Sequence, residues 1–252
     1  MITAKDVIEK IEDFAPLSGQ EEYDNSGLTA GDEKSAVSGI FITLDVDEDA
    51  IRQAKRHNCN FILSHHPLIF EPVKSLNLNN YQTRVIALAI KENMTVYAAH
   101  TSADNAENSI AHSNLTDIGA RNIYNIGELF IGDIQETTVE NLAAKFGDIT
   151  LENGLKYTFK NKSVKKAGHI NGSGGRMSDI LPVLTEHKVD VFISSEFKYS
   201  FLRELYYNSI AVIESNHYNG ERAFLKIMKN ILSKDFDNVV VNEVTGNPYQ
   251  KE

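Results

Sequence analysis

Two adjacent histidines, His65 and His66, interrupt an apolar run over residues 61–70, FILSHHPLIF. Imidazoles bind first-row divalent metals and exchange protons near neutral pH. A bounded apolar run is typical of a buried strand, and the pair falls where that strand would end. Neighbouring strand side chains point to opposite faces, so both histidines can reach one centre only where the backbone turns or where two metals are bound. The alternative is a pair of ordinary hydrogen-bonding residues at a strand end.

Two further clusters pair a histidine with a carboxylate four residues later. His100 precedes Asp104, and His217 precedes Glu221. This spacing places both side chains on one face of a helical turn, which is how many helix-borne metal ligands are paired. The alternative for each pair is a capping histidine and a first-turn acid favoured by the helix dipole.

Each of the three clusters follows a short apolar segment of the chain. Because the carboxyl ends of parallel strands lie on one edge of a sheet, we expect the clusters to face a shared point. Nitrogen and oxygen ligands without a thiolate suit zinc, manganese, iron, cobalt or nickel. The clusters offer three to five ligands to that point. Five would exceed the needs of one open zinc site and would favour two divalent ions with one bridging carboxylate. An anionic small-molecule substrate would balance their charge.

The positions of the helices and strands follow from apolar periodicity and turn residues. A capping signature at Thr3 and Asp6 precedes apolar residues at helical spacing, which predicts a first helix over 4–14. Strands are predicted at 36–44, 60–64, 95–99, 155–159, 166–170, 189–194, 210–214 and 239–244. Further helices are predicted at 48–57, 84–92, 107–118, 137–146, 177–187, 197–207 and 216–232. Residues 23–28 are predicted to form a turn. The alternation of strand and helix predicts an α/β protein with parallel pairing, and a change of rhythm predicts a domain boundary near 125.

Composition excludes several classes of protein. The 252 residues are 42% hydrophobic and 24% charged, as in a globular protein of one large or two small domains. A net charge of −10 without a clustered basic patch argues against general nucleic-acid binding. The one basic run, residues 160–166, is interpreted as a solvated sheet edge. No signal-peptide pattern and no long apolar run is present, so we expect a cytoplasmic protein without a membrane span. The single Cys59 is predicted to be a small core residue.

Seven sequence blocks occur in a fixed order between Asp24 and Glu221. They read DNSGLTAG, LDV, SHHPLIF, AAHTSAD, NGSGG, DVFISSE and NHYNGE. Together they resemble the GTP cyclohydrolase I type 2 homologue family, also named the NGG-interacting-factor-three-like family. The resemblance implies a dinuclear metal centre whose ligands are, by position, His65, His66, Asp104, His217 and Glu221.

The same resemblance implies a fold, an assembly and an activity. It implies two interleaved α/β domains with mixed, largely parallel sheets, the metal site lying at strand ends in the cleft between them. We divide them as 1–125 with 215–252, carrying most ligands, and 126–214. It also implies a toroidal homohexamer and a hydrolase in which water attacks C8 of the guanine ring of GTP and formate is released. Hydrolysis of a phosphoester would use the same centre, and the rival class is a non-enzymatic metal-binding, metal-delivery or regulatory protein.

The chain departs from the family pattern in two places, before and at Glu196 and directly before His217. Ser194, Ser195 and Glu196 stand where a glycine-threonine-glycine type lead is usual, and Asn216 replaces a glycine before the last histidine. These changes leave the ligands intact but leave the substrate undetermined.

Several other residues are candidates for roles around the metals. Glu196 and His169, which also follow strands, are candidates for facing the metals from the second domain, Glu196 with a catalytic role; structural roles are the alternative. Residues 171–175 are interpreted as a tight turn rather than a phosphate cradle. Candidates for orienting the metal ligands are Asp45, Asn25, Ser64 and Thr101.

Overall fold

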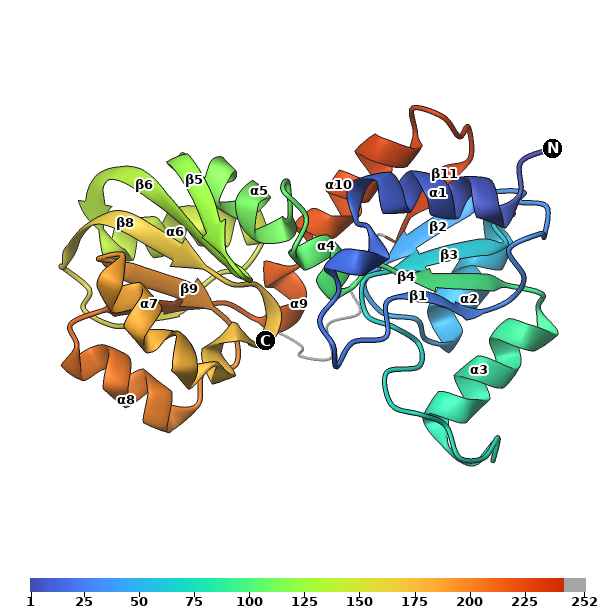
Figure 1. Ribbon diagram of the computed structural model, residues 1–252, viewed down its shortest axis with the longest axis horizontal. Helices are drawn as coiled ribbons and strands as arrows, with labels where there is room; N and C mark the ends of the chain where they lie inside the picture. The colour runs from blue at the N-terminus through green and yellow to red at the C-terminus, as the bar shows by residue number, and fades with distance from the viewer. Residues whose placement is uncertain (243–252) are drawn as a thin grey trace. The chain divides into compact units, whose positions relative to one another are not determined.

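The protein is described here by a computed structural model that covers residues 1–242 in two compact units (Figure 1). Unit 1 contains Met1–Ala106 and, among the described residues, 224–242, and unit 2 contains Glu107–Ala223. The boundaries expected near 125 and 215 therefore both fall inside unit 2, and His217 and Glu221 belong to unit 2. The difference arises because the helix after residue 107 packs on the second sheet. Apolar periodicity predicts that a helix forms, but it does not predict which sheet the helix packs on.

Unit 1 is built on a five-stranded sheet. Four of its strands are parallel, and the edge strand β1 pairs antiparallel with β4. The order across the sheet is β1 (Gly27–Ala30), β4 (Thr95–Ala98), β3 (Phe61–Ser64), β2 (Ile40–Thr43) and β11 (Val239–Val241). Because β2, β3 and β4 are neighbours and parallel, the segments that follow them begin at the same edge of the sheet.

Helices cover this sheet. They are α1 (Ala4–Phe14), α2 (Glu48–Arg56), α3 (Tyr81–Lys91), α4 (Thr101–Asp104), α10 (Ala223–Leu232) and the 3-10 turn η1 (Leu17–Gly19). The predicted helix over 4–14 is confirmed, and Thr3 and Asp6 form its capping box. Apolar residues of α2 and α3 pack with Phe41, Ile62 and Val96 of three successive strands. Cys59 is buried in this core, as predicted, and burial raises the pKa of its thiol to about 11.

Unit 2 is built on a six-stranded mixed sheet. Three central strands, β8, β9 and β10, are parallel, and the outer strands pair antiparallel. The order is β5 (Arg121–Ile126), β6 (Leu129–Thr138), β8 (Ser163–His169), β9 (Val191–Ser194), β10 (Ala211–Glu214) and β7 (Lys156–Tyr157). The predicted α/β class with two mixed sheets is confirmed.

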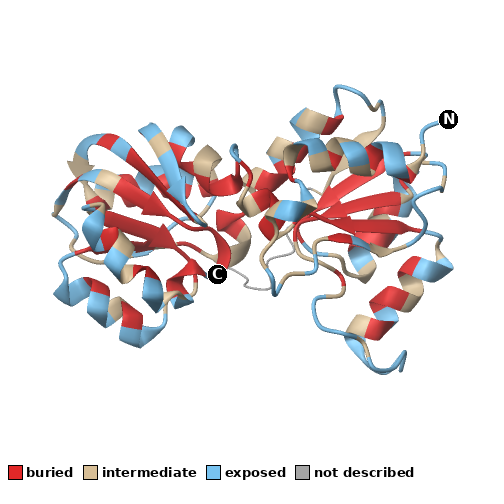
Figure 2. Ribbon diagram, in the orientation of Figure 1, coloured by how far each residue is buried: buried red, intermediate tan, exposed pale blue. Residues whose placement is uncertain are grey.

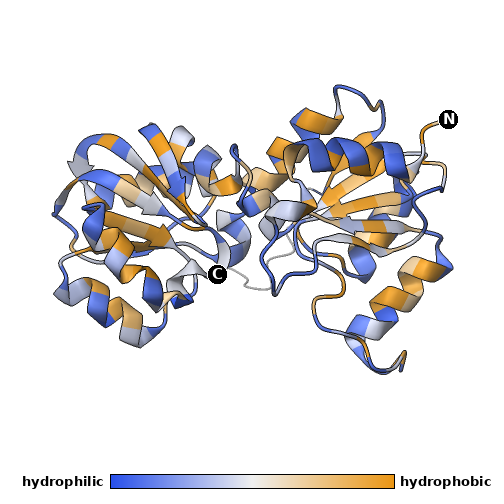
Figure 3. Cartoon of the chain, viewed as in Figure 1, coloured by the Kyte–Doolittle hydropathy of each residue, from blue (hydrophilic) through white to orange (hydrophobic). Residues whose placement is uncertain are grey.

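Both faces of the second sheet are covered by helices. These are α5 (Ile110–Asp117), α6 (Val139–Thr150), η2 (Gly172–Arg176), η3 (Ser178–Ile180), α7 (Leu181–Glu186), α8 (Tyr199–Tyr207) and α9 (His217–Gly220). On β9, Val191 and Ile193 pack with α5 and α6, while Phe192 packs with α7 and α8. The strand is therefore apolar on both faces, which explains its uninterrupted apolar sequence (Figures 2 and 3).

Four sequence predictions need correction or limits. Residues 27–30 form β1 rather than part of a turn, because pairing with β4 stabilises a segment with weak strand preference of its own. The helix expected over 216–232 is two helices, α9 and α10. The basic run at 160–166 leads into β8, an interior strand, so the prediction of a sheet edge is wrong. The last strand is described only over 239–241, and residues 243–244 lie outside the described part.

Within residues 1–242, no helix is both long enough and apolar enough to cross a membrane.

Candidate metal centre

The histidine pair lies directly beyond β3. The strand ends at Ser64, and the backbone bends at His65 and His66. The amides of the pair donate to the carbonyls of Thr43 (3.2 Å) and Leu44 (2.9 Å), so the end of β2 holds both residues in place. The bend brings the two rings to the same side, with centroids 5.0 Å apart. The predicted strand end is confirmed.

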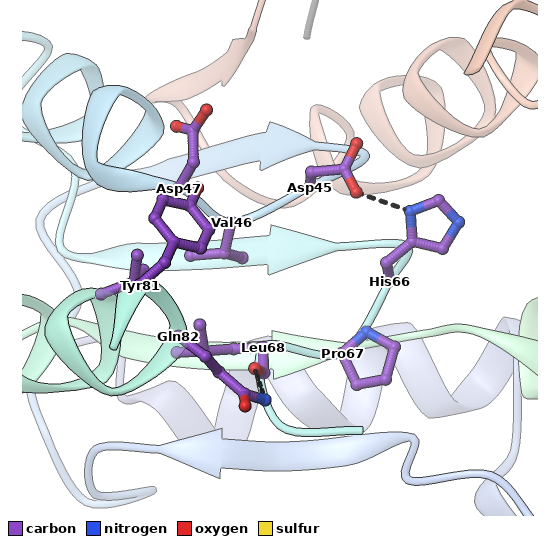
Figure 4. A pocket seen from close by; sticks show the side chains of 9 residues that line it. Asp45, Val46, Asp47, His66, Pro67, Leu68, Tyr81 and Gln82 are labelled. Atoms are coloured by element: carbon purple, nitrogen blue, oxygen red, sulfur yellow. Dashed lines mark hydrogen bonds and ion pairs between the residues drawn. The ribbon is translucent and has the colours of Figure 1, made fainter. Parts of the chain in front are cut away.

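Each ring of the pair has its Nδ1 atom beside an acceptor. His65 Nδ1 lies 3.0 Å from the carbonyl of Ala99, and His66 Nδ1 lies 2.8 Å from Asp45 Oδ1 (Figure 4). Because a carbonyl only accepts, the proton of neutral His65 is on Nδ1. Nε2 is then the electron-pair donor of each ring, which is the arrangement of histidines that bind metals.

A third histidine that our predicted ligand set omits completes this cluster. His100 follows β4, and its ring centroid lies 5.2 Å from that of His65 and 5.5 Å from that of His66. One candidate ligand atom from each of the three lies within 4.8 Å of the others. His100 Nδ1 lies 2.7 Å from Asp24 Oδ1, so this ring too has a carboxylate beside Nδ1.

Asp24 is the residue of this cluster that sequence reasoning missed. Its side chain is buried, and it accepts from His100, from the amide and hydroxyl of Thr101 and from the hydroxyl of Ser26. Burial by itself would raise the pKa of Asp24, but the hydrogen bonds from His100 and Thr101 outweigh it and hold the pKa well below its usual range. Asp24 is therefore a charged anchor for His100.

The predicted ligand Asp104 closes α4, four residues after His100. Its Oδ1 lies 3.7 Å from His65 Nε2, and the side chain is largely buried. A carboxylate oxygen and an imidazole lone pair that face each other form a stable pair only when a proton or a cation lies between them. Unit 1 thus brings together three predicted ligands, His65, His66 and Asp104.

The second cluster lies at the parallel strand ends of unit 2. His217 begins α9, three residues after β10, and Glu196 lies two residues after β9. His217 Nδ1 is 2.8 Å from Glu196 Oε1, and Arg176 Nη2 is 2.6 Å from Glu196 Oε2. Both oxygens of Glu196 are thus engaged, which suits a residue that orients His217 better than a proton acceptor in catalysis. The neighbouring parallel ends of β9 and β10 were the sequence signal for this contact.

The predicted ligand Glu221 is buried beside the same ring. Its Oε1 lies 3.2 Å from His217 Nε2, as the spacing of four residues predicts. Gly172 makes room for this carboxylate: its φ is +60°, and a Cβ there would lie 2.6 Å from Glu221 Oε1. A Cβ at Gly175 would lie 2.4 Å from the carbonyl of Ser195. The glycine loop at 171–175 therefore packs closely against the segments that carry Glu196 and Glu221.

A buried hydrogen-bond chain fixes the backbone before Glu221. His169 Nδ1 lies 2.9 Å from the carbonyl of Ile193, and its Nε2 accepts from Asn114 at 3.1 Å. Asn114 also donates to the carbonyl of Gly220 at 2.9 Å. Burial lowers the pKa of His169 to about 4, so the ring is neutral near pH 7. His169 therefore supports the carboxylate-bearing turn and contacts no predicted ligand through its ring nitrogens.

The four predicted orienting residues have different outcomes. Asp45 contacts His66, and Thr101 acts one step away through Asp24. Asn25 and Ser64 instead contact backbone carbonyls, of Ile69 and Tyr97. The expectation of one sheet edge for all three clusters is wrong, because β10 belongs to the second sheet. Six strand ends carry these groups: β2, β3 and β4 in unit 1, and β8, β9 and β10 in unit 2.

The donor set fits a divalent metal. In unit 1, His65, His66 and His100 form a group of nitrogen ligands that could hold an ion. In unit 2, an oriented imidazole faces a buried carboxylate. Neither cluster contains a thiolate, so the donors suit zinc, manganese, iron, cobalt or nickel.

Comparison with known proteins identifies the family of the chain. The family model described as Duf34/NIF3 (NGG1p interacting factor 3) matches residues 2–248. This chain belongs to the DUF34/NIF3 family. Its predicted resemblance to the GTP cyclohydrolase I type 2 homologues is confirmed by relatives that carry this name.

Two relatives of the DUF34/NIF3 chain align over nearly its whole length. The GTP cyclohydrolase 1 type 2 homolog of Clostridium acetobutylicum is 28% identical over 96% of this chain and 93% of its own. The GTP cyclohydrolase 1 type 2 of Helicobacter pylori is 27% identical over 99% of both chains.

Solved structures show the same fold. A Staphylococcus aureus hypothetical protein has a TM-score of 0.88 at 22% identity and covers 99% of both chains. A Bacillus cereus protein related to NIF3 has a TM-score of 0.89 at 16% identity and covers 100% of this chain and 99% of its own. At these identities the likeness shows the fold of the DUF34/NIF3 chain and nothing further.

Proposed function

We propose that this DUF34/NIF3 protein is a dinuclear metal-dependent hydrolase that acts on a nucleotide or another phosphorylated small molecule. The observation that carries the proposal is the set of three imidazoles in unit 1, each with an acceptor at Nδ1. The proposed ligands are His65, His66, Asp104, His217 and Glu221. When bound, two divalent cations would supply Lewis-acid activation of water.

The residues of the chain have separate roles in this proposal. Asp45 and Glu196 hold the rings of His66 and His217 in the tautomer that presents Nε2. Glu221, whose carboxylate is buried beside His217, would be the ligand shared between the two ions. His100 is a further candidate ligand, held by Asp24.

The name of the Helicobacter pylori relative, GTP cyclohydrolase 1 type 2, supports GTP as the first substrate to test. We further propose a toroidal homohexamer, which rests on the family resemblance, and a cytoplasmic location, which rests on the sequence pattern. Light scattering on the purified chain measures the assembly directly.

Metal content per chain, followed by a substrate screen, tests the proposal. Untagged protein should hold two metals per chain and hydrolyse GTP or a phosphoester once that metal is restored. Two metals without turnover would favour the metal-binding or metal-delivery alternative. Fewer than one metal per chain would overturn the dinuclear centre.

The variant Glu221→Ala tests the ligand set. Removing the proposed bridge should empty at least one of the two sites while the circular dichroism spectrum stays that of the wild type. The matched control is Glu204→Ala, because Glu204 is an exposed glutamate on α8 and is not among the proposed ligands. If Glu221→Ala keeps two metals per chain, the assigned ligand set is wrong.

A further inference from the structure

A pocket of about 380 Å³ lies beside His66 in unit 1 (Figure 4). It is formed by the segment after β2, the segment after the histidine pair, and the first turns of α3. Its volume is within the range of ordinary small-molecule sites, roughly 300–1,000 Å³. Of the residues that line it, only His66 belongs to the proposed ligand set, so metal binding does not explain the other side chains of the pocket.

The walls of the pocket suit a flat ring. Figure 4 shows the ring of Tyr81 on one side and Pro67 with His66 on the other. Val46 and Leu68 also line it. Tyr81 is 56% exposed although it begins a helix with a well-formed apolar face. An exposed tyrosine at the mouth of a pocket provides a stacking surface for a planar heterocycle.

Three side chains that line the pocket, Asp45, Asp47 and Gln82, carry acceptor oxygens. Asp45 Oδ1 accepts from His66, and Asp47 Oδ1 accepts from the amide of Ala50. Among the described residues, the second oxygen of each carboxylate makes no hydrogen bond. The amide nitrogen of Gln82 donates to the carbonyl of Leu68 at 3.3 Å, which leaves its oxygen as a third acceptor.

The pocket is also negatively charged. Neither a lysine nor an arginine is among its lining residues. Burial is the largest cause of the raised pKa of Tyr81; the nearby carboxylates of Asp47, Glu48 and Asp45 add to it, and Arg84 opposes it. A phosphate group would be repelled here, whereas N–H donors would find three acceptors.

We propose that this pocket binds a planar nitrogen heterocycle that carries ring N–H or exocyclic amino donors, as an aminopurine does. Tyr81 stacks on the ring, and Asp45, Asp47 and Gln82 accept its N–H groups. The inference deepens the proposed function and rests on it for one consequence: the substrate enters with its base beside His66 and its phosphates pointing away from the pocket.

Binding of 2-aminopurine ribonucleoside to the full-length, chelator-treated protein tests the pocket. The chain has no tryptophan, so the fluorescence of the probe is read without interference. We expect saturable quenching as the base stacks on Tyr81. Tyr81→Ala should weaken binding at least about fivefold, and Tyr81→Phe should retain it. Tyr199→Ala, which removes an exposed tyrosine of α8, is the matched control and should bind as wild type.

A second, independent test changes the charge of the pocket or removes the amino group of the ligand and measures binding again. Asp47→Asn keeps a good cap for α2 but removes the charge, so it should weaken binding about fivefold or more without unfolding the protein. Purine ribonucleoside, which lacks the amino group, should compete at least about fivefold less well than the probe.

Two results would overturn the inference. One is the absence of saturable quenching by wild-type protein, and the other is equal binding by wild type, Tyr81→Ala and Asp47→Asn. Because these titrations are done without metal, their failure leaves the metal count and Glu221→Ala experiments unaffected. Conversely, a protein without a dinuclear centre could still bind the heterocycle, so the two proposals fail separately.

Discussion

The histidines at the strand ends fall into two groups according to what lies beside Nδ1. Those beside a backbone carbonyl, His65 and His169, are fully buried. Those beside a carboxylate are more exposed: His66, His100 and His217. A carboxylate at Nδ1 makes Nε2 a stronger electron-pair donor, whereas a carbonyl fixes the tautomer without added charge. The three carboxylate-bound rings are therefore the stronger metal-ligand candidates by this criterion.

His169 should make the stability of the protein depend on pH. Its pKa is about 4 in the folded protein, against 6.5 for the unperturbed side chain. The unfolded chain binds the proton more tightly, so the stabilisation is present above about pH 6.5 and is lost as the pH falls towards 4. The loss should reach about 3 kcal/mol in the free energy of unfolding.

Urea denaturation between pH 7 and 4, in the presence of chelator, measures this dependence. The variant His169→Gln removes the titrating group and should flatten the slope over this range. An NMR titration of the wild-type imidazole gives a direct check, because a midpoint near 6.5 for His169 would show that the neutral, buried ring is misassigned.

At the scale of elements, the short turn η2 matters for the carboxylate of Glu221. It follows β8, and its first residue, Gly172, has a positive φ and lies against Glu221. The carbonyl of Gly172 accepts from the amide of Ser195, and the amide of Gly175 donates to the carbonyl of Ser195. These contacts join the ends of β8 and β9 without a side chain. The turn is therefore a close-packing element, as the sequence interpretation favoured over a phosphate cradle.

Gly172→Ala should displace the carboxylate. The new Cβ would lie 2.6 Å from Glu221 Oε1, so the carboxylate must move, and metal content should fall below that of wild type. Gly127→Ala is the matched control: its φ of +57° imposes a similar backbone strain, and no atom lies within 4 Å of its Cβ position. Both variants should lose about 1 kcal/mol of stability from the positive φ. Equal metal content in the two variants would contradict a role of Gly172 in holding Glu221.

At the scale of the whole molecule, the chain builds its first unit from both ends. Unit 1 receives α10 and β11 from the C-terminal segment, where β11 pairs with β2 and α10 buries Phe224 and Met228. The Phe224 ring centroid lies 4.9 Å from that of His65, so this returning segment also supports the histidine pair. Unit 2, in contrast, is continuous in sequence and has core clusters on both faces of its sheet.

This difference predicts different behaviour for fragments. A fragment of residues 107–223 contains all elements of unit 2 and should unfold cooperatively in urea, because its sheet and both core clusters are complete. A fragment of residues 1–106 lacks α10 and β11, so it should expose the β2 edge and the α10 contact surface and fail to show a cooperative transition. A folded 1–106 fragment, or an unfolded 107–223 fragment, would contradict this division of the chain.

Local patterns in the sequence determined much of the fold and part of the site. The capping box and helical spacing located α1, and the apolar run of β3 located the bend at His65 and His66. The spacing of four residues placed His217 and Glu221 in contact. These features are predictable because helix and strand periodicity and capping depend on residues close together in the chain.

Only the tertiary structure decided which distant residues meet. Asp24 and His100 are 76 residues apart, and Glu196 and His217 are 21 apart. It also decided that β1 is a strand and that β10 belongs to the second sheet. The physical reason is that these choices depend on burial and on hydrogen bonds formed when whole elements pack together. Such pairing cannot be read from a single sequence. The periodicity that predicts each helix or strand can, because it depends only on the residues of that element.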